Sequence, residues 1–450
     1  MRVLLVRPER VGEFSAQGRH QIKHVPLGLL YLAGTLRTHR HDVRICDEIV
    51  GDDVALAIRE FQPDLMGITC TTPLWDRVQK LVAIAKESGI KVVVGGPHVS
   101  ALPELCLKEA PIDAAATGEG EETLVELCES RDWTQVKGVV LRDGNGGYLH
   151  TPTRPMPDDL DEIPFPAYDL VKREKYMGDD ELGFYVRKNE NLIRIFSSRG
   201  CPFLCTYCSS HNTFGRPLRI RSAQNVVEEL RELTSLWKTK NVCFMDDIFT
   251  INQDRVREVC EAMRSADLKL RWSCFSRVGL TEPTVKEMAA AGCILIGFGV
   301  ETGSAAVLKR IKKATTLDQA RDTFRLLDKY GIRRKAFFMI NFPGETRQEF
   351  EETVNFAIEL NPDYVMLSIF IPLPGSELFD GVNPADYAHH TTKSFFHTSD
   401  PETRARQLEF LQRYHFRMGY VKTMMKNFSP RHLPYYLNLF RHYLAVRAAS

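Results

Sequence analysis

The sequence lacks the features that would place the protein in several common classes. None of its apolar runs is long enough to span a bilayer, and the apolar stretch near the amino terminus is too short for a secretory signal. Charge of one sign is not in excess, since 59 Lys and Arg stand against 58 Asp and Glu. Bulk charge therefore does not predict a nucleic-acid partner, and we expect a cytoplasmic protein.

A second group of closely spaced cysteines is also missing. Eight of the 11 cysteines are scattered singly along the chain: Cys46, Cys70, Cys106, Cys128, Cys243, Cys260, Cys274 and Cys293. Isolated thiols in a reducing compartment are usually small core residues, and disulfides are rare there. The sequence therefore predicts neither a disulfide framework nor an auxiliary metal cluster.

The other three cysteines lie together in the run Cys201-Pro-Phe-Leu-Cys205-Thr-Tyr-Cys208. Three thiolates in one loop can hold three irons of a [4Fe–4S] cluster, which usually has four cysteine ligands. The fourth iron is then open to a small molecule. His211 offers a competing interpretation, as the fourth ligand of a Cys3His zinc site. Structural zinc usually holds together small modules with little core, and the strands and helices around this loop disfavour it.

The spacing C-x3-C-x2-C, with Tyr207 directly before the last cysteine, resembles the signature of the radical S-adenosylmethionine (SAM) enzymes. The resemblance implies that SAM binds at the open iron and is cleaved reductively to a radical that abstracts hydrogen from an unactivated carbon. It also implies a low-potential electron donor such as flavodoxin or ferredoxin. Tyr207 is expected to pack near the cluster and the adenine.

Residues 191–380 alternate short apolar runs with helical patterns. Six runs read as strands: residues 192–197, 241–245, 270–275, 294–300, 335–341 and 364–370. Six such units cannot close an eight-stranded barrel. They suit the open, partial (β/α)6 barrel of the radical SAM enzymes that the cysteine loop resembles.

Polar or glycine residues follow several of these strands, where active groups of such folds gather. The resemblance implies that Asp246 and Asp247 accept hydrogen bonds from the SAM amino group. It assigns Glu301 to the ribose and the loop around Gly344 to the adenine. Arg277 could bind the SAM carboxylate as a two-pronged donor. The alternative for each of these residues is a helix cap or a surface charge.

The first 150 residues show a similar alternation, which predicts a doubly wound parallel sheet. The expected strands are residues 3–6, 43–46, 65–70, 92–95 and 113–117. Ligands of such sheets bind beyond the carboxyl ends of the strands. Residues 137–141 and 148–151 flank a glycine-rich turn and predict a hairpin.

Small and polar residues follow the third, fourth and fifth of these strands. They are Thr69, Thr71, Gly95, Gly96, His98, Thr117, Gly118 and Glu119. Ordinary turn chemistry explains each of them singly. Together with the run PLGLLYLA from residue 26, the runs GGPHVSALPE and ATGEGEETL resemble the cobalamin-binding domain of one large class of radical SAM enzymes.

The Asp-x-His-x-x-Gly motif of cobalamin mutases, whose histidine binds cobalt, is absent. The resemblance therefore implies cobalamin without a protein histidine on cobalt, and His98 is expected to line the pocket of the nucleotide tail. The implied activity is C-methylation of a small-molecule or lipid-type substrate. Oxidative cyclisation or rearrangement, with or without cobalamin, is the alternative. A non-catalytic metal- or cobalamin-binding sensor is a remote one.

Two further segments complete the expected organisation. Residues 151–190 are rich in proline, which disfavours helix and stiffens a linker. Residues 381–450 are expected to form a helical tail, which after Glu409 has no acid, seven Lys or Arg and nine aromatics. Aromatic residues at helical spacing favour packing against the barrel, with weak peripheral membrane contact as a secondary role.

Overall fold

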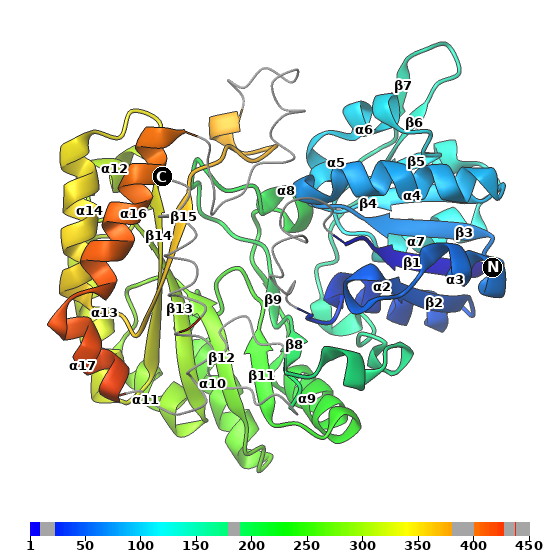
Figure 1. Ribbon diagram of the computed structural model, residues 1–450. Coiled ribbons are helices and arrows are strands. Elements are labelled where there is room, and N and C mark those ends of the chain that lie inside the picture. Colours follow the sequence, from blue (N-terminus) through cyan, green and yellow to red (C-terminus); the bar gives the residue numbers. More distant parts are fainter. Residues whose placement is uncertain (10–22, 179–189, 380–399, 427–436, 438–450) are drawn as a thin grey trace.

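The computed structural model describes residues 1–9, 23–178, 190–379, 400–426 and 437. Two β-sheets organise this part of the chain, a seven-stranded sheet from the amino-terminal third and a six-stranded sheet from the second half. Figure 1 shows them side by side, with β9 (Ser198–Arg199) and the short helix α8 (His211–Phe214) between them.

The amino-terminal sheet has the strand order β2-β1-β3-β4-β5-β6-β7. Its strands are β1 (Arg2–Arg7), β2 (Asp42–Asp47), β3 (Leu65–Thr69), β4 (Lys91–Gly95), β5 (Ala114–Ala116), β6 (Val139–Arg142) and β7 (Tyr148–His150). The first five in this order are parallel, which confirms the predicted doubly wound sheet. The predicted hairpin is β6–β7, and it extends this sheet in antiparallel fashion beside β5.

Helices cover both faces of this sheet. One face packs α2 (Leu27–Thr38) and α7 (Glu121–Glu129), and the other packs α3 (Val54–Phe61), α4 (Trp75–Glu87) and α6 (Pro103–Glu109). The strand order reverses between β1 and β3. A ligand of such a sheet binds at this reversal, beyond the carboxyl ends of the strands.

The second sheet is parallel throughout and has the order β8-β11-β12-β13-β14-β15. Its strands are β8 (Ile193–Ile195), β11 (Asn241–Phe244), β12 (Arg271–Ser276), β13 (Cys293–Glu301), β14 (Arg333–Ile340) and β15 (Tyr364–Ile369). The covering helices are α9 (Ala223–Trp237), α10 (Gln253–Ser265), α11 (Glu282–Ala290), α12 (Ala305–Arg310), α13 (Leu317–Lys329) and α14 (Arg347–Leu360). This is the predicted open (β/α)6 barrel.

The proline-rich linker is packed against both sheets. It contains three 3-10 turns in the described residues, η4 (Leu160–Glu162), η5 (Tyr168–Leu170) and η6 (Arg173–Tyr176). The Tyr168 hydroxyl donates to the Arg194 carbonyl at 2.5 Å. A Cβ on Gly34 of α2 would lie 2.4 Å from the Phe165 carbonyl oxygen, so glycine lets the linker cross this helix closely. The exact domain boundaries stay a prediction.

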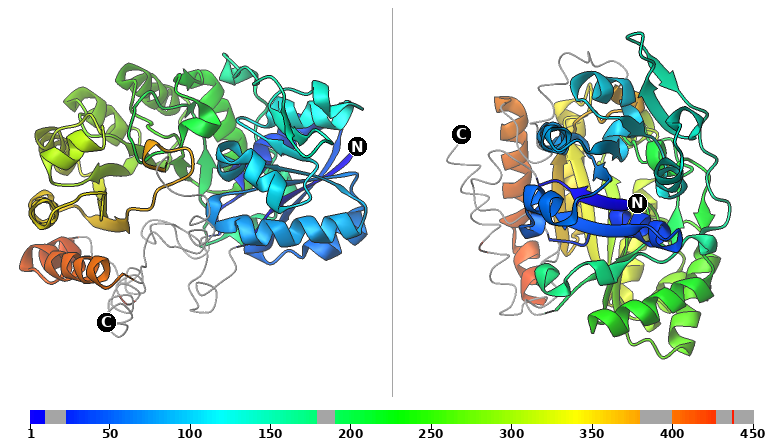
Figure 2. Two further views of the ribbon diagram at one scale, coloured as in Figure 1. Left: turned by 90° about the horizontal axis from the view of Figure 1, so that it is seen from above. Right: turned by 90° about the vertical axis from the view of Figure 1, so that its right-hand side faces the viewer.

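The described part of the tail is helical and lies against the barrel. Helix α16 (Pro401–His415) packs against α14, and α17 (Met418–Lys426) packs against α16; both lie at the edge of the barrel (Figure 2). Phe410 is fully buried against Phe338, and the Tyr414 hydroxyl donates to the Pro362 carbonyl at 2.6 Å. The predicted packing is therefore confirmed for these two helices, while residues 380–399, 427–436 and 438–450 lie outside the described residues. No helix in the described ranges is long and apolar enough to cross a membrane.

Candidate functional site: a cysteine-lined cavity at the barrel edge

The three grouped cysteines lie in the loop after β9, at the carboxyl edge of the barrel sheet. Gly200 precedes the first of them with a φ of +92°, and a Cβ there would lie 2.1 Å from the Pro217 carbonyl oxygen. Only glycine fits this position. The amide of Cys201 donates to the Gly215 carbonyl at 3.3 Å. The loop is thus tied to the segment that follows it.

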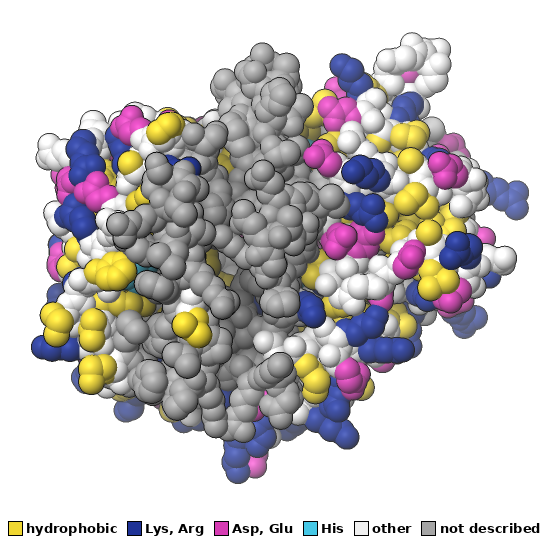
Figure 3. Space-filling view, viewed as in Figure 1, with side chains coloured by type: hydrophobic (Ala, Val, Ile, Leu, Met, Phe, Trp, Pro, Cys, Tyr) yellow, Lys and Arg dark blue, Asp and Glu magenta, His cyan; other side chains and the backbone are white. Residues whose placement is uncertain are grey.

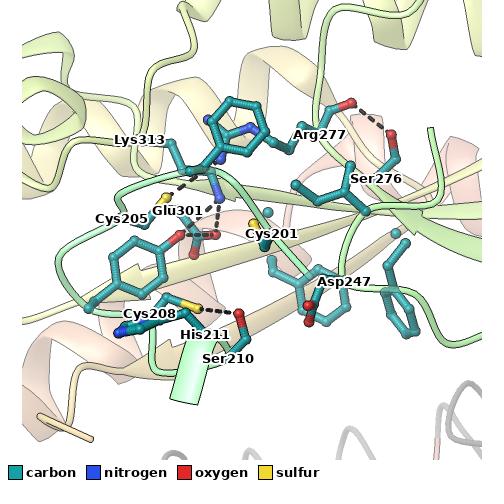
Figure 4. A pocket seen from close by; sticks show the side chains of 17 residues that line it. Cys201, Cys205, Cys208, Ser210, His211, Asp247, Ser276, Arg277, Glu301 and Lys313 are labelled. Atoms are coloured by element: carbon teal, nitrogen blue, oxygen red, sulfur yellow. Dashed lines mark hydrogen bonds and ion pairs between the residues drawn. The ribbon is translucent and has the colours of Figure 1, made fainter. Parts of the chain in front are cut away.

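A cavity of about 230 Å³ opens beside this loop (Figure 4). Cys201, Cys205 and Cys208 line it, and each is half-buried. The opposite wall comes from the inner face of the barrel, where Gly297 leaves room between Phe275 and Phe337: a Cβ on this glycine would come within 3.0 Å of both rings. The cavity is therefore shaped by the sheet as well as by the loop.

The donor set fits a cluster better than a single metal ion. Zinc needs its sulfur ligands about 2.3 Å from one point, yet no three His, Cys, Asp or Glu side chains of the described residues are grouped to hold one ion. His211 does line the cavity. Three thiols spread around a shared cavity match the soft ligands of a [4Fe–4S] cluster with one iron lacking a protein ligand.

Glu301, Tyr207 and Lys313 form a hydrogen-bonded group in the cavity wall. The Lys313 Nζ lies 2.7 Å from Glu301 Oε1 and 2.9 Å from the Tyr207 hydroxyl, which itself donates to the same Oε1 at 2.9 Å. Lys313 and Glu301 are buried. Burial, and next the Glu301 carboxylate, raise the pKa of Tyr207, so its hydroxyl remains a donor.

The backbone around Glu301 is shaped for this contact. Glu301 has a φ of +67°, in the left-handed region that side chains other than glycine rarely adopt. A Cβ on Gly299 would lie 2.3 Å from Glu301 Oε1 and 2.7 Å from the Lys313 Nζ. Strained residues of this kind concentrate at functional sites, and here a missing side chain makes room for the carboxylate.

The two neighbouring aspartates after β11 have different surroundings. The Asp246 carboxylate is fully buried and accepts hydrogen bonds from the amides of Ser197 and Ser198 at 2.7 and 2.5 Å. It therefore holds the turn after β8 and does not line the cavity. Asp247 does line the cavity and reaches solvent through it. Desolvation and then the Asp246 charge raise the pKa of Asp247 to about 6.

Arg277 also lies where the sequence predicts it, in the cavity wall. Its guanidinium carbon stands 3.8 Å from the centre of the Phe203 ring, and Nη1 lies 3.5 Å from the Cys205 sulfur. Nη2 is buried without a hydrogen-bond partner among the described residues. This donor is available to an anionic ligand in the cavity.

Gly344 lies apart from this group. It sits in the exposed loop after β14 with a φ of +71°, and it is absent from the residues that line the cavity. A Cβ there would meet nothing within 4 Å, so the space next to this backbone is open.

The predicted residues of the amino-terminal sheet mark its carboxyl edge. Thr71 is exposed, while Thr69 and Gly95 are half-buried. Gly96 has a φ of +101°, and a Cβ there would lie 2.8 Å from the Cys70 carbonyl oxygen. Glycine at this position is therefore required by the fold, whatever ligand the edge binds.

His98 belongs to the interior behind this edge. It is 1% exposed, its Nδ1 lies 3.2 Å from the Thr72 hydroxyl, and its ring centre lies 5.3 Å from that of Trp75. Burial lowers the pKa of His98 to about 4, so the imidazole is neutral. The sequence led us to expect His98 on the wall of a ligand pocket. In the structure the side chain is packed in the interior of the domain.

The last three predicted residues, after β5, divide between two environments. The Thr117 hydroxyl donates to the Gly138 carbonyl at 3.2 Å. Gly118 has a φ of +74° and open space around it. The Glu119 carboxylate binds two arginines of the barrel half, Arg199 and Arg219.

The sequence did not single out Lys313, Arg199 or Arg219. Lys313 follows three other basic residues in the run KRIKK, and nothing in this pattern separates it from a solvated charge. Arg199 directly precedes Gly200 and Cys201. This adjacency to the cysteine loop is the one feature of the sequence that could have marked it as part of the site. The partners of all three are distant in sequence, at separations from 12 to 106 residues.

Comparison with known proteins agrees with this architecture. Residues 195–357 match the model of the radical SAM superfamily, and residues 21–128 match the B12-binding domain. The structure of the radical SAM methyltransferase TsrM from Kitasatospora setae, with cobalamin and a [4Fe–4S] cluster, superposes with a TM-score of 0.68 at 19% identity over 84% of this chain and 73% of that one. This match shows the shared fold.

Curated relatives are similar over most of their length. An uncharacterized methyltransferase from Pyrococcus horikoshii is 38% identical over 79% of this chain and 78% of its own. An anaerobic magnesium-protoporphyrin IX monomethyl ester cyclase from Rubrivivax gelatinosus is 31% identical over 84% of this chain and 69% of its own. A hopanoid C-3 methylase from Methylococcus capsulatus is 27% identical, over 78% and 67%. The chain therefore belongs to the radical SAM enzymes that carry an amino-terminal B12-binding domain.

Proposed function

We propose that this protein is a cobalamin-dependent radical SAM methyltransferase that methylates an unactivated carbon of a small-molecule or lipid-type substrate. The observation that carries the proposal is the cavity where three thiols, an available guanidinium nitrogen and two carboxylates meet. When bound, the cluster supplies the electron that cleaves SAM, and cobalamin supplies the methyl group. The protein supplies ligands, orientation and exclusion of water.

The thiols and the charged side chains of the cavity have separate roles in this proposal. Cys201, Cys205 and Cys208 hold the cluster. The Arg277 Nη2 donates to the SAM carboxylate, since a guanidinium binds carboxylates in a fork, and Asp247 accepts from the SAM amino group.

Glu301 accepts from the ribose hydroxyls, and Lys313 and Tyr207 fix its orientation through their shared contact with Oε1. Tyr207 additionally packs beside the adenine. The open backbone at Gly344 contacts the adenine edge. Asp246 acts indirectly, because its carboxylate holds the turn that leads into the cysteine loop.

The cobalamin site lies along the carboxyl edge of the amino-terminal sheet. Thr69, Thr71, Gly95, Thr117 and Gly118 are the residues we place on its wall, because they are half-buried or exposed at that edge. Gly96 and His98 support the wall from behind. No protein imidazole reaches cobalt in this proposal.

Two partners belong to the proposal as well. Reductive cleavage of SAM consumes one electron, which a low-potential donor such as flavodoxin or ferredoxin would deliver. Weak contact with a membrane surface is supported by α17, where Met418 and Met425 are 72% and 73% exposed. Such contact would suit a lipid-type substrate.

Oxidative cyclisation is the second candidate, because relatives at 31% and 30% identity are named cyclases. Relatives named methyltransferases or methylases, among them one at 38% identity, favour methylation. The two activities differ in what they make from SAM. The methyltransferase forms 5′-deoxyadenosine and also S-adenosylhomocysteine, the second only in the presence of cobalamin, whereas a cyclase forms 5′-deoxyadenosine and no S-adenosylhomocysteine.

The test is anaerobic reconstitution with iron and sulfide, followed by reduction and incubation with SAM. We expect about four irons per chain, as one cubane cluster requires, 5′-deoxyadenosine, and S-adenosylhomocysteine only when cobalamin is present. Deoxyadenosine with no S-adenosylhomocysteine would support the cyclase instead. A non-catalytic sensor would give neither product.

Substitution of the ligands gives the matched control. Alanine at Cys201, Cys205 or Cys208 should remove the cluster absorbance and SAM cleavage together. Alanine at Cys128, a buried thiol of the other domain, should leave both intact. Stoichiometric zinc in protein purified without oxygen, with no iron uptake on reconstitution, would refute the cluster assignment.

A further inference from the structure

Two arginines and two glutamates form a buried cluster of ion pairs between the two halves of the molecule. The Arg199 guanidinium binds Glu119 at 2.5 Å and Glu121 at 2.7 Å, and the Arg219 guanidinium binds the other oxygen of Glu119. The four side chains are between 4% and 13% exposed. We call this group the interdomain ion cluster.

The interdomain ion cluster connects two segments that the proposed function treats separately. Glu119 follows Thr117 and Gly118 at the edge where we place cobalamin. Arg199 precedes Gly200 and Cys201, the first proposed cluster ligand. One hydrogen-bonded side-chain pair therefore joins the cobalamin edge to the cysteine loop.

Neighbouring contacts hold the same junction. The Arg199 guanidinium lies 5.2 Å from the Tyr31 ring centre and 5.3 Å from that of Phe214. Tyr31 belongs to the run PLGLLYLA of α2, and Phe214 belongs to α8, which packs against α5 (Pro97–Ala101) of the amino-terminal domain. Arginine is suited to such a site, because it can pair with a carboxylate and stack on aromatic rings at the same time.

We propose that Glu119 is a positioning residue, which with Glu121 locks the amino-terminal domain onto the cysteine loop through Arg199 and Arg219. The inference rests on the proposed function, since it concerns how the cobalamin edge faces the cluster cavity. Each oxygen of Glu119 accepts a hydrogen bond from one arginine, Oε2 from Arg199 and Oε1 from Arg219, so the carboxylate is held by the barrel half. Methyl transfer needs the two cofactors in one fixed geometry, and a buried network in which each side chain pairs with an opposite charge favours one arrangement of the two halves.

The experiment compares Glu119→Gln with Glu126→Gln. Both replace a glutamate that pairs with arginine, Glu119 just before α7 and Glu126 within it. Glu126, however, pairs with Arg154 of the linker and not with the barrel half. Each protein is reconstituted with iron, sulfide and hydroxocobalamin and then reduced with dithionite. Pulsed electron paramagnetic resonance measures the dipolar coupling between cobalt(II) and the reduced cluster.

We expect Glu119→Gln to bind cobalamin and iron as the wild-type protein does, but to lose the single resolved cobalt-to-cluster distance. Glu126→Gln should keep it. A change in stability alone would not move this distance, so the readout separates positioning from general support. Loss of cobalamin binding in Glu119→Gln with an unchanged thermal midpoint would make Glu119 a cobalamin contact and overturn the inference. An unchanged distance would overturn it as well.

Two additions keep the inference separable from the proposed function. If Glu119→Gln does not fold, Glu121→Gln takes its place. This variant removes only the ion pair between Glu121 and Arg199 and should broaden the distribution of cobalt-to-cluster distances without abolishing its maximum. If the wild-type protein binds no cobalamin, the proposed function fails, and amide hydrogen exchange then tests the lock. Glu119→Gln should raise exchange in both residues 117–121 and 198–201, while an effect confined to residues 117–121 would refute the lock.

Discussion

Arg277 makes two contacts that belong to different parts of the proposed chemistry. Its Nη1 lies 3.5 Å from the Cys205 sulfur, while its buried Nη2 is available to a ligand in the cavity. A positive charge or hydrogen bond beside a cluster sulfur favours the reduced, more negative cluster. The same side chain can therefore affect both the reduction potential of the cluster and the affinity for SAM.

We predict that Arg277→Met lowers the cluster potential and weakens SAM binding. At a fixed solution potential the ratio of reduced to oxidised cluster should fall by about tenfold, which corresponds to 59 mV for one electron. A redox titration followed by electron paramagnetic resonance measures this ratio. Lys312→Met is the control, because Lys312 lies near the cavity but pairs with Glu377 at the surface. Equal potentials in Arg277→Met and the wild-type protein would contradict the proposed contact with the cluster.

The raised pKa of Asp247 predicts that SAM binding depends on pH. Its pKa is raised to about 6, so the carboxylate is charged at neutral pH and becomes protonated as the pH falls through this value. The charged form attracts the positively charged SAM. We expect the Kd for SAM, measured by equilibrium dialysis, to rise between pH 7.5 and pH 5.5. In Asp247→Asn the Kd should be higher throughout and lack this rise, and an identical pH profile in the variant would exclude Asp247 as its source.

At the scale of elements, hydrophobic patterning was sufficient to predict the sheets. The expected strand at residues 294–300 is β13 (Cys293–Glu301), and that at residues 241–245 is β11 (Asn241–Phe244). The barrel sheet and the first five strands of the amino-terminal sheet are parallel and covered by helices, so most of their strands are apolar runs that stand out in a sequence. Strand ends then located Asp247, Arg277 and Glu301 at the cavity.

The remaining features of the site depend on tertiary contacts that no local pattern encodes. Asp246 and Asp247 are adjacent residues of the same type. Only the fold shows that the Asp246 carboxylate accepts hydrogen bonds from the backbone amides after β8. Glu119 stands in a glycine-rich turn typical of a ligand site, and its partners come from the other half of the chain. Lys313 likewise acquires its role only when the segment after α12 meets β13.

Helix α16 gives a prediction about stability. Phe410 and Phe416 lie six residues apart, but Phe410 is fully buried and Phe416 is 65% exposed. Replacing a buried phenylalanine by alanine typically costs about 3–5 kcal/mol, from lost burial and the cavity left behind. We expect Phe410→Ala to lower the free energy of unfolding of the barrel by about this amount and Phe416→Ala by about 0.5 kcal/mol or less. Urea unfolding followed by tryptophan fluorescence measures both, and equal costs would show that α16 does not pack as described.

On the scale of the whole molecule, the two edges that we propose to bind ligands are joined at one junction. The helix α8 and the strand β9 lie between the two sheets (Figure 1), so the cysteine loop faces the amino-terminal domain. On the face drawn in Figure 3, the described residues mix basic and acidic side chains. The described part of this face does not carry the one-sided basic patch that is typical of a nucleic-acid-binding surface.

Helix α17 is the exception on this surface, and it carries the last prediction. Met418, Val421 and Met425 are spaced along one helical face and are 72%, 40% and 73% exposed, whereas Tyr420 on another face is buried. Figure 3 shows apolar side chains at the surface over this helix. Such a face, followed by a chain segment with basic residues and no acids, suits the surface of an anionic bilayer.

We expect the protein to bind vesicles of phosphatidylcholine and phosphatidylglycerol weakly in a flotation assay, and less at high salt. Each basic residue near such a surface contributes about 1 kcal/mol, and salt screens it. Met418→Asp combined with Met425→Asp should remove binding without changing the thermal midpoint, because both side chains are exposed. Leu56→Asp, at an exposed position of α3, should leave binding unchanged. If the wild-type protein fails to float with anionic vesicles even at low salt, α17 does not bind membranes. The proposal that the membrane presents the substrate would then have no support from this helix.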